Sequence, residues 1–484
     1  MTYLIGLDIG TTNAKAIAVS SDGRLLAAES ASYPAVSPQT GYAEQDTDVV
    51  VAACLKVLKK AVLCEGQLAG IAFSAAMHGV LPVDESGQPL SRCIIWADNR
   101  SSGYASQLKH STVGASIYRR TGTPLHSMSP LCKIAWLRDH DPEVFQRAHK
   151  FVSIKEYLVF RLTGEWAVDY SLASATGLFD NAGLHWHPEA LDFAGLRPES
   201  LSTPVSPYHV FRTWLPGMAE KLDIEPGTPL IIGASDGCLA NLGELATEPG
   251  DAVITIGTSA ALRVTQNKAL VDKKGRIFNY LLTAGWYVAG GASNNGGSAW
   301  QWLCDDFMKT PLEEAARLAQ SVNPGTDGLL FLPWLLGERA PIWNEAARGV
   351  FLGISGHHQQ AHFCRAVLEG VVFNLFQIGK IVEESGAGIQ RIYANGGFTK
   401  MPVWVQIVAD VFGVEVVVRD NGDSSAFGAV LLGMKALGIL TGFDAVRHFF
   451  KAKKIYTPDA ERHEAYQACL LCYEKAAACL SPLF

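Results

Sequence analysis

The stretch YLIGLDIGTTNAKA, residues 3–16, decides the fold. An apolar run leads into Asp8, then into a Gly-Thr-Thr turn at 10–12, and then into a second apolar stretch that contains Lys15. Short apolar runs on both sides of a glycine turn predict two antiparallel strands, over residues 3–8 and 14–20. A buried strand that ends in an acid, a glycine, two hydroxyls and a cation is suited to a phosphate and its metal ion.

Each residue type in this turn has a separate use in phosphate binding. Glycine lets the backbone approach an anion closely, and the hydroxyls of Thr11 and Thr12 can donate hydrogen bonds to it. Lys15 adds a point charge, and Asp8 can hold Mg²⁺ directly or through water. Taken alone, the stretch is better explained as an ordinary hairpin turn, and the phosphate interpretation gains only if a second such turn faces it.

The opening pattern returns in the second half of the chain. DAVITIGTSAALRVT, residues 251–265, again predicts a strand, a Gly-Thr-Ser turn and a strand. Two such hairpins predict a duplicated architecture with a cleft between the halves, and the alternation of strands and helices predicts an α/β protein. The Glu-Pro-Gly signal at 248–250 is the best boundary, which gives an N-terminal domain over 1–246 and a C-terminal domain over 247–484.

Composition excludes several classes of protein. The 484 residues are 48% hydrophobic and 18% charged, with a net charge of −7, which argues against a nucleic-acid footprint. No stretch reaches the roughly 18 apolar residues of a membrane span, and the opening residues do not form a signal peptide, so a cytoplasmic protein with reduced thiols is expected. Cys469 and Cys472 lack a second ligand pair, so a structural metal site is not predicted there.

A second candidate for chemistry is GASDG, residues 233–237, where a strand pattern gives way to a helix pattern. A carboxylate at Asp236, among small residues, can accept the proton of a hydroxyl that attacks phosphorus. A helix N-cap is the alternative role for this aspartate. The P-loop and the dinucleotide fingerprint GxGxxG are both absent from the sequence, so the two Gly-Thr turns remain the candidates for phosphate binding.

Two further stretches, MHG at 77–79 and WADNR at 96–100, combine hydrogen-bonding groups with aromatic surface. Such a mixture suits a polyol or a sugar acid, which needs several hydrogen bonds and an apolar face. A purely structural role is the alternative for His78.

With these residues in view, the chain resembles the FGGY family of carbohydrate kinases over nearly its whole length. Six stretches in the family's order carry the resemblance: DIGTTNAKA (8–16), MSPLCKIAWLRDH (128–140), ITIGTSA (254–260), GVFLGISGHHQQAHFCRAVLE (349–369), ANGGFTKMPVWVQIVADVFGVEV (394–416) and DSSAFGAVLLG (423–433). The resemblance implies an α/β, two-domain actin/hexokinase-like (ribonuclease H-like) fold with an interdomain cleft.

The resemblance also implies ATP and Mg²⁺ as cofactors and a role for each matching residue. Asp236 would be the catalytic base and Asp8 would organise Mg²⁺. The first half would bind the sugar and the second half most of the nucleotide. The residues implied for ATP are Thr11, Thr12, Lys15, Gly257 and Thr258 at the phosphates, and Asn395, Gly396, Gly397 and Phe398 at the adenosine.

The sugar-side stretches are most similar to those of the gluconate kinases in this family. These stretches are FSAAMHG (73–79), IIWADNRS (94–101), GTPLHSMSP (122–130) and DYSLASATGLFD (169–180). The resemblance implies that the terminal hydroxyl of D-gluconate is phosphorylated to give 6-phosphogluconate. The implied substrate residues are Met77, His78, Arg100, His126 and Asp236.

Physically, the carboxylate of gluconate needs a cationic or hydrogen-bonding partner, for which His126, Arg100 and Lys155 are the candidates. Xylulose or another ketose is the alternative substrate, although Ala76 stands where xylulose kinases carry glutamine. Glycerol kinases have an Arg-Glu pair in place of Met77 and His78. A non-catalytic sugar sensor and an actin-like filament former are the alternatives from other classes, and a homodimer is one expected assembly.

Overall fold

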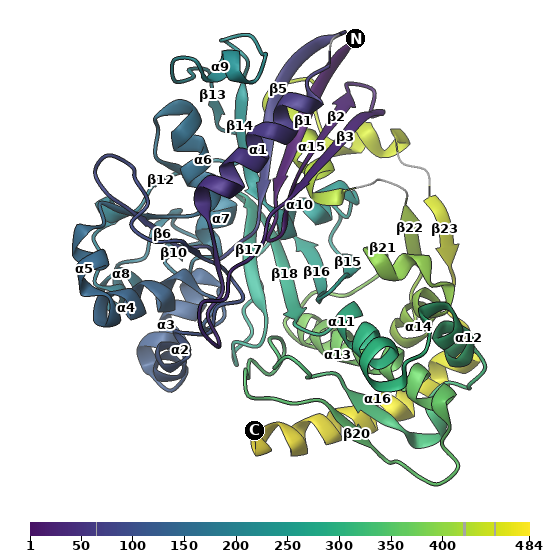
Figure 1. Cartoon of the computed structure of the whole chain (residues 1–484). Helices are drawn as coiled ribbons and strands as arrows, with labels where there is room; N and C mark the ends of the chain where they lie inside the picture. The colour runs from purple at the N-terminus through teal and green to yellow at the C-terminus, as the bar shows by residue number, and fades with distance from the viewer. Residues whose placement is uncertain (64, 420–422, 450–451) are drawn as a thin grey trace.

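Two large mixed sheets, each flanked by helices, form the framework of the molecule (Figure 1). The computed structural model describes residues 1–63, 65–419, 423–449 and 452–484. This is the two-domain α/β architecture that the sequence predicts.

The first sheet has the order β13-β14-β5-β1-β2-β3. β1 pairs antiparallel with β2 and parallel with β5, which confirms the predicted hairpin. Most of β1 is buried because α1 covers one face of the sheet and α15 covers the other. The elements are β1 (Thr2–Ile9), β2 (Asn13–Ser20), β3 (Leu25–Ser32), β5 (Gln67–Ala75), β13 (Val210–Phe211), β14 (Leu230–Ser235), α1 (Thr47–Ala61) and α15 (Ser424–Ala436).

The second sheet has the order β17-β18-β16-β15-β21-β22-β23. Its hairpin β15–β16 is antiparallel, and β15 is also parallel to β21. The long helix α13 packs against β16 and β18. The elements are β15 (Asp251–Ile256), β16 (Ala260–Gln266), β17 (Phe278–Thr283), β18 (Trp286–Ser293), β21 (Arg391–Asn395), β22 (Val416–Arg419), β23 (Ala452–Tyr456), α13 (Gln360–Glu384) and α14 (Pro402–Phe412).

The two sheets repeat one topology. In each, a first strand pairs antiparallel with the next strand of the chain and parallel with a later one, which in turn pairs parallel with a fourth. The order β2-β1-β5-β14 therefore corresponds to β16-β15-β21-β22. This repeat confirms the duplicated architecture expected from the two hairpins.

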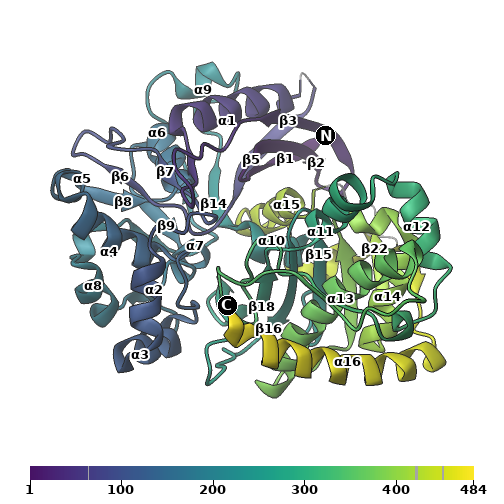
Figure 2. The ribbon, with the colours of Figure 1, turned by 60° about the horizontal axis from the view of Figure 1, so that its bottom comes forward.

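Two helices, α10 (Asp236–Gly243) and α15, lie together between the sheets (Figure 2). Their close approach depends on glycine: a Cβ at Gly243 would lie 1.9 Å from the carbonyl oxygen of Ser424, and one at Gly428 would lie 2.1 Å from that of Leu239. Although α15 comes late in the chain, it covers the first sheet. The boundary at residue 246 stays a prediction.

A group of smaller elements lies beside the first sheet (Figure 1). Residues 129–149 contain two helices, α4 (Pro130–His140) and α5 (Pro142–Arg147), and the Asp141 side chain caps the second by accepting a hydrogen bond from the N–H of Val144. The other helices of this group are α2 (Ser102–Lys109), α3 (Thr112–Thr121), α6 (Ile154–Thr163), α7 (Tyr170–Ser174) and α8 (Pro188–Ala194).

The chain ends in α16 (Ala460–Leu480), which carries Cys469 and Cys472 as free thiols. Along the chain, β18 is followed by α11 (Gly297–Gln301), a π-helical turn over 302–308, and α12 (Leu312–Gln320). In the part of the chain that the structure describes, every helix is too short or too polar to cross a membrane.

Candidate active site

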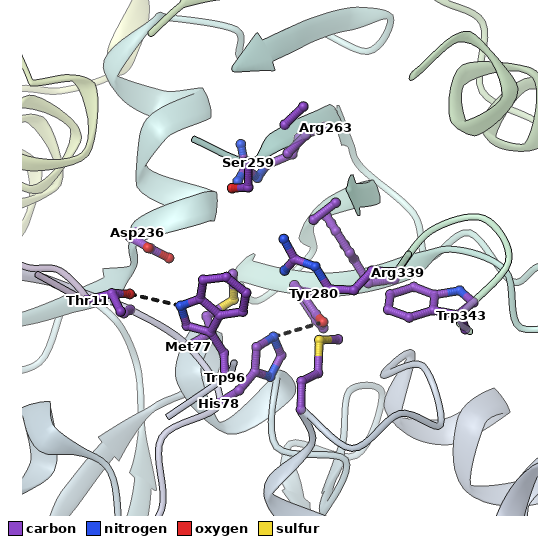
Figure 3. Close-up of a pocket in the computed structure, with 16 residues that line it drawn as sticks. Thr11, Met77, His78, Trp96, Asp236, Ser259, Arg263, Tyr280, Arg339 and Trp343 are labelled. Atoms are coloured by element: carbon purple, nitrogen blue, oxygen red, sulfur yellow. Dashed lines mark hydrogen bonds between the residues drawn. The ribbon is translucent and has the colours of Figure 1, made fainter. Parts of the chain in front are cut away.

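A cavity of about 200 Å³ lies between the two halves and takes residues from both (Figure 3). Thr11 and Ser259 bring one Gly-Thr turn from each half to its wall. The side chains that line it and that carry the arguments below are Thr11, Met77, His78, Trp96, Asp236, Ser259, Arg263, Tyr280, Arg339 and Trp343. The predicted cleft between the halves is thus present, and both hairpins reach it.

Asp236 is the first residue of α10, directly after β14, and its carboxylate faces the cavity (Figure 3). Ser235, not Asp236, is the N-cap residue, and the Asp236 carboxylate accepts a hydrogen bond from the N–H of Gly237 at 2.6 Å. Burial raises the pKa of Asp236, and the nearby Arg263 guanidinium opposes that rise. A carboxylate in this position can accept a proton from a bound hydroxyl.

Asp8, at the end of β1, is 9% exposed and accepts a hydrogen bond from the Ser74 hydroxyl at 2.6 Å. Burial, together with the carboxylates of Asp423 and Asp236, raises the pKa of Asp8 to about 8. Lys15 Nζ is 2.8 Å from Asp423 Oδ2, so the predicted phosphate contact is ion-paired here. Carboxylates that disfavour one another's charge are suited to a divalent cation.

The described residues contain no group of three or more His, Cys, Asp or Glu side chains close enough to ligate a metal by themselves. Mg²⁺ keeps several waters and takes one or two carboxylates together with substrate phosphates, so a single protein carboxylate can be enough to hold it. The residues around Asp8 fit such an ion.

The first turn is held by side chains. Trp96 Nε1 donates to the Thr11 hydroxyl at 2.8 Å, and Gln45 Nε2 donates to the Thr11 carbonyl at 2.6 Å. Thr12 is exposed, and its hydroxyl accepts a hydrogen bond from the Asn13 amide. The turn therefore presents Thr12 outward while Thr11 is fixed at the cavity wall.

The second turn is held by backbone. The N–H of Gly297, at the start of α11, donates to the Gly257 carbonyl at 2.6 Å, and the N–H groups of Gly296 and Ser298 donate to the Thr258 carbonyl at 3.1 Å each. The Thr258 side chain is exposed. The predicted phosphate residues Gly257 and Thr258 thus lie on a loop that is open to an incoming ligand.

The residues predicted at the adenosine follow β21, next to the second turn. Gly396 has φ +98°, and a Cβ there would lie 2.5 Å from the Ile256 carbonyl, one residue before Gly257. Gly396 and Gly397 are exposed, whereas the Phe398 ring is buried edge-on against Trp404. The Asn395 amide donates to Glu244 and Ser424 at 3.3 Å each. An open surface therefore continues from the phosphate turn.

His78 lines the cavity with Met77 and has φ +69°, which is rare outside glycine. Its Nδ1 is 2.8 Å from the Ala175 carbonyl, and its Nε2 is 3.5 Å from the Tyr280 hydroxyl. Burial, with the charge of Lys133, lowers the pKa of His78 to about 3. The imidazole is therefore neutral, with Nδ1–H donating to Ala175 and Nε2 free to accept from a hydroxyl.

The three candidates for a carboxylate contact lie outside the described lining of the cavity, and each already faces an acid. Arg100 donates to Asp98 and Glu44 at 2.5–2.9 Å, His126 Nε2 is 3.0 Å from Glu345 Oε1, and Lys155 Nζ is 2.5 Å from Asp169 Oδ2. Each of these acids already occupies the positive charge or the hydrogen-bond donors with which its partner would bind the carboxylate of a substrate.

Sequence reasoning missed two arginines that do line the cavity, Arg263 on β16 and Arg339 just after Glu338. Arg263 is the only charge inside the apolar alternation of β16, and that isolation was an available signal. The aromatic residues Tyr280 and Trp343 were missed as well, because their strands and loops read as ordinary core.

A cavity between two duplicated sheets, with a Gly-Thr turn from each and an aspartate facing it, defines the actin-like class of two-domain ATP-using enzymes. Family models sharpen that class: the N-terminal domain of the FGGY family of carbohydrate kinases matches residues 3–243, and the C-terminal domain matches residues 252–437. The chain belongs to the FGGY family of carbohydrate kinases. The predicted family and fold are confirmed.

The relatives differ more in their sequence identity to this chain than in the similarity of their structures to it. The chain is 42% identical to the gluconokinase of Bacillus subtilis, over 97% of this chain and 94% of that protein. It is 30% identical to a xylulose kinase of Staphylococcus epidermidis, over 97% and 95%. Among solved structures, a gluconate kinase and a ligand-bound xylulose kinase from Lactobacillus acidophilus are each 32% identical, with TM-scores of 0.95 and 0.96, and cover 98–99% of both chains.

Proposed function

We propose that this kinase transfers the γ-phosphoryl group of MgATP to the terminal hydroxyl of D-gluconate, giving 6-phosphogluconate, in the cytoplasm. The single observation that carries the reaction type is the Asp236 carboxylate, which faces a cavity reached by both Gly-Thr turns. The gluconate assignment is supported by the higher identity to gluconokinases, 42%, than to xylulose kinases, 30%.

The reaction divides among residues of both halves. Asp236 takes the proton of the terminal hydroxyl as its oxygen attacks the γ-phosphorus, and the bond to the β-γ bridging oxygen breaks to release ADP. The N–H groups and hydroxyls of the two turns hold the phosphates, and Gly396 with Gly397 lies against the adenosine. His78 Nε2 accepts a hydrogen bond from a sugar hydroxyl. Phosphoryl transfer of this kind depends mainly on positioning and charge stabilisation.

Asp8, supported by the Ser74 hydroxyl, is the residue we assign to Mg²⁺. When bound, the ion neutralises charge on the transferring phosphates. Lys15, ion-paired to Asp423, stands beside the same carboxylates and can turn toward a phosphate when it arrives.

A ketose such as xylulose is the alternative acceptor, because the solved xylulose kinase is as similar in shape as the gluconate kinase. A non-catalytic sensor is disfavoured because Asp236 and both turns meet at one cavity, and Asp8 lies near enough for its charge to interact with that of Asp236.

The test is an ADP-coupled assay of the purified protein with D-gluconate, D-xylulose, L-ribulose, L-rhamnulose and glycerol. A strong preference for gluconate supports the proposal. A preference for a ketose retains the mechanism and removes gluconate, whereas no turnover of any acceptor favours the sensor. Light scattering of the same sample measures whether the protein is a homodimer.

A further inference from the structure

Arg263 and Arg339 enter the cavity wall from different elements of the second half and point toward the same space (Figure 3). Arg263 Nη1 makes one long hydrogen bond, 3.3 Å to the Thr255 hydroxyl. Arg339 Nη2 donates to the Ser293 carbonyl at 3.1 Å, and its guanidinium lies 4.6 Å from the centre of the Trp96 ring. Both cations are held in place without being fully hydrogen-bonded.

Each of these arginines has a buried Nε–H that, within the described residues, has no hydrogen-bond partner. Buried polar groups in folded proteins are nearly always paired, because leaving a donor without an acceptor costs free energy. Two such donors belong to guanidinium groups at the wall of one cavity, which marks this wall as a place where an oxyanion can supply acceptors.

The charges that face the cavity also favour an anionic ligand. Asp236 is the one lining carboxylate in the described part of the chain, and it stands against two guanidinium groups. His78 is neutral because burial and Lys133 lower its pKa, and burial keeps Tyr280 protonated. Glu338 is adjacent to Arg339, but its oxygens accept from Ser293, Asn294 and Asn295 and from backbone N–H of Arg339 rather than from the guanidinium.

We propose that Arg263 and Arg339 together form the subsite that binds the carboxylate of the sugar acid. This inference deepens the proposed function and rests on it. Arginine presents planar, paired N–H donors that match a carboxylate. A bound acid therefore neutralises the excess positive charge and supplies acceptors to the Nε–H groups of both arginines. A neutral ketose of similar length leaves them unpaired, and a site of this kind rejects such a ligand. This assignment replaces Arg100, His126 and Lys155.

The same oxyanion chemistry is present in the γ-phosphate of ATP, so the experiment must separate the two sources. A carboxylate contact lowers activity with acidic acceptors more than with neutral ones, and so changes the ratio of the two. A γ-phosphate contact changes acidic and neutral acceptors equally, and also changes the slow hydrolysis of ATP in the absence of any acceptor.

The variants are Arg263→Gln and Arg339→Gln, each paired with its lysine counterpart. Arg161→Gln is the matched control, because Arg161 lies on α6 over the Tyr157 ring and outside the cavity. For each protein, kcat/KM is measured with D-gluconate and with D-glucitol, which carries CH₂OH in place of the carboxylate. Melting temperatures and ATP affinity identify variants that fold poorly.

The expected result is a fall of about 10²-fold in the ratio of kcat/KM for gluconate to kcat/KM for glucitol in each glutamine variant, with partial rescue of that ratio by lysine. Arg263→Gln also lowers both values in parallel, because the guanidinium that opposes the raised pKa of Asp236 is lost. The control should keep the wild-type ratio of the two acceptors. A wild-type ratio in both glutamine variants overturns the inference. Equal losses with both acceptors, together with altered ATP hydrolysis, also overturn it in favour of the γ-phosphate.

A competition assay separates failure of this inference from failure of the proposed function. D-gluconate and D-glucitol are tested as inhibitors of whichever acceptor the wild-type protein phosphorylates fastest. If that acceptor is a ketose, the proposed function fails, but the subsite still requires that gluconate inhibits better than glucitol and that both variants abolish the difference. If gluconate is phosphorylated and its advantage survives both variants, the function stands and the subsite is wrong.

Discussion

The two Gly-Thr turns have nearly the same sequence but are built and supported differently. In the first hairpin, Ile9 pairs with Ala14, five residues on, whereas in the second Ile256 pairs with Ala260, four residues on, so the second turn is one residue shorter. The residue two places before the glycine is Asp8 in the first and Thr255 in the second. Only the first turn has an acid.

The contacts that hold the two turns in place also differ. Side chains from the first half, Trp96 and Gln45, fix the first turn, while backbone N–H groups at the start of α11 fix the second. Two turns of similar sequence are therefore held in different ways. We interpret the first turn as the metal and acceptor side, and the second turn, continuous with Gly396, as the nucleotide side.

The largest effect is expected at the residue between the two turns. Asp236→Asn removes the proton acceptor but leaves both turns in place, so kcat should fall by ~10²–10⁴-fold while ATP affinity stays near the wild-type value. Steady-state kinetics and calorimetry measure the two quantities. Retained turnover would remove Asp236 from the role of base.

The next effect tests the asymmetry of Asp8 and Thr255. Asp8→Asn should weaken activity by about 10–100-fold and raise the Mg²⁺ concentration needed for half-maximal rate, because the carboxylate near the ion is lost. Thr255→Val, the matched change in the second hairpin, should leave the Mg²⁺ requirement near the wild-type value. Equal shifts in both variants would show that the halves share the metal.

Backbone support of the second turn is tested by Gly296→Ala. The new Cβ would lie 2.5 Å from the Ser259 carbonyl, so the loop must move, at a cost of about 1–3 kcal/mol. KM for ATP should rise and the melting temperature should fall. Gly10→Ala in the first turn meets its nearest atom, the Asn13 carbonyl, at 3.0 Å and should be milder. The reverse order would contradict this account of the supports.

Side-chain support of the first turn is tested by Trp96→Phe, which keeps the aromatic ring and removes the donor to Thr11. Loss of one hydrogen bond, worth about 0.5–1.5 kcal/mol, should reduce kcat/KM by a few-fold. Ser298→Ala, in helix α11 next to the second turn, removes a buried hydroxyl that has no partner within the described residues and should cost less. A larger loss from Ser298→Ala would show a hidden contact there.

The smallest effect is expected from pH in the neutral range, measured at a saturating Mg²⁺ concentration, because a bound cation keeps Asp8 ionised despite its raised pKa. Because burial raises the pKa of Asp236, kcat/KM should fall on the acid side as the carboxylate is protonated, with a midpoint above the ordinary aspartate value of about 3.9. His78, whose pKa is lowered to about 3, stays neutral and adds no limb near pH 6.5. A limb near 6.5 that disappears in His78→Asn would contradict this assignment.

The sequence predicted what depends on local pattern. Alternating apolar runs around glycine turns gave both hairpins, and a strand-to-helix change among small residues gave the position of Asp236. It did not predict that α15 covers the first sheet, because that packing depends on a glycine contact between segments far apart in the chain: a Cβ at Gly6 of β1 would lie 2.2 Å from the carbonyl oxygen of Ala426 in α15.

The prediction of a carboxylate contact at Arg100, His126 or Lys155 rested on residue type alone. Arg100 and Lys155 are cations in sequence, but the structure shows that Glu44, Asp98 and Asp169 already compensate them. The orphan donors of Arg263 could not be seen without the register of β16 against β18, which turns that side chain toward the cavity. Charge can be read from sequence, whereas compensation of charge cannot.

The central claim is that the acceptor lies between the two turns with its terminal hydroxyl at Asp236. The most direct measurement is a crystal structure with D-gluconate and a non-hydrolysable ATP analogue. The account predicts the terminal hydroxyl about 2.6–3.2 Å from the Asp236 carboxylate, with the phosphates against both turns. A terminal hydroxyl beyond hydrogen-bonding reach of Asp236, or phosphates away from the Gly257 turn, would contradict it.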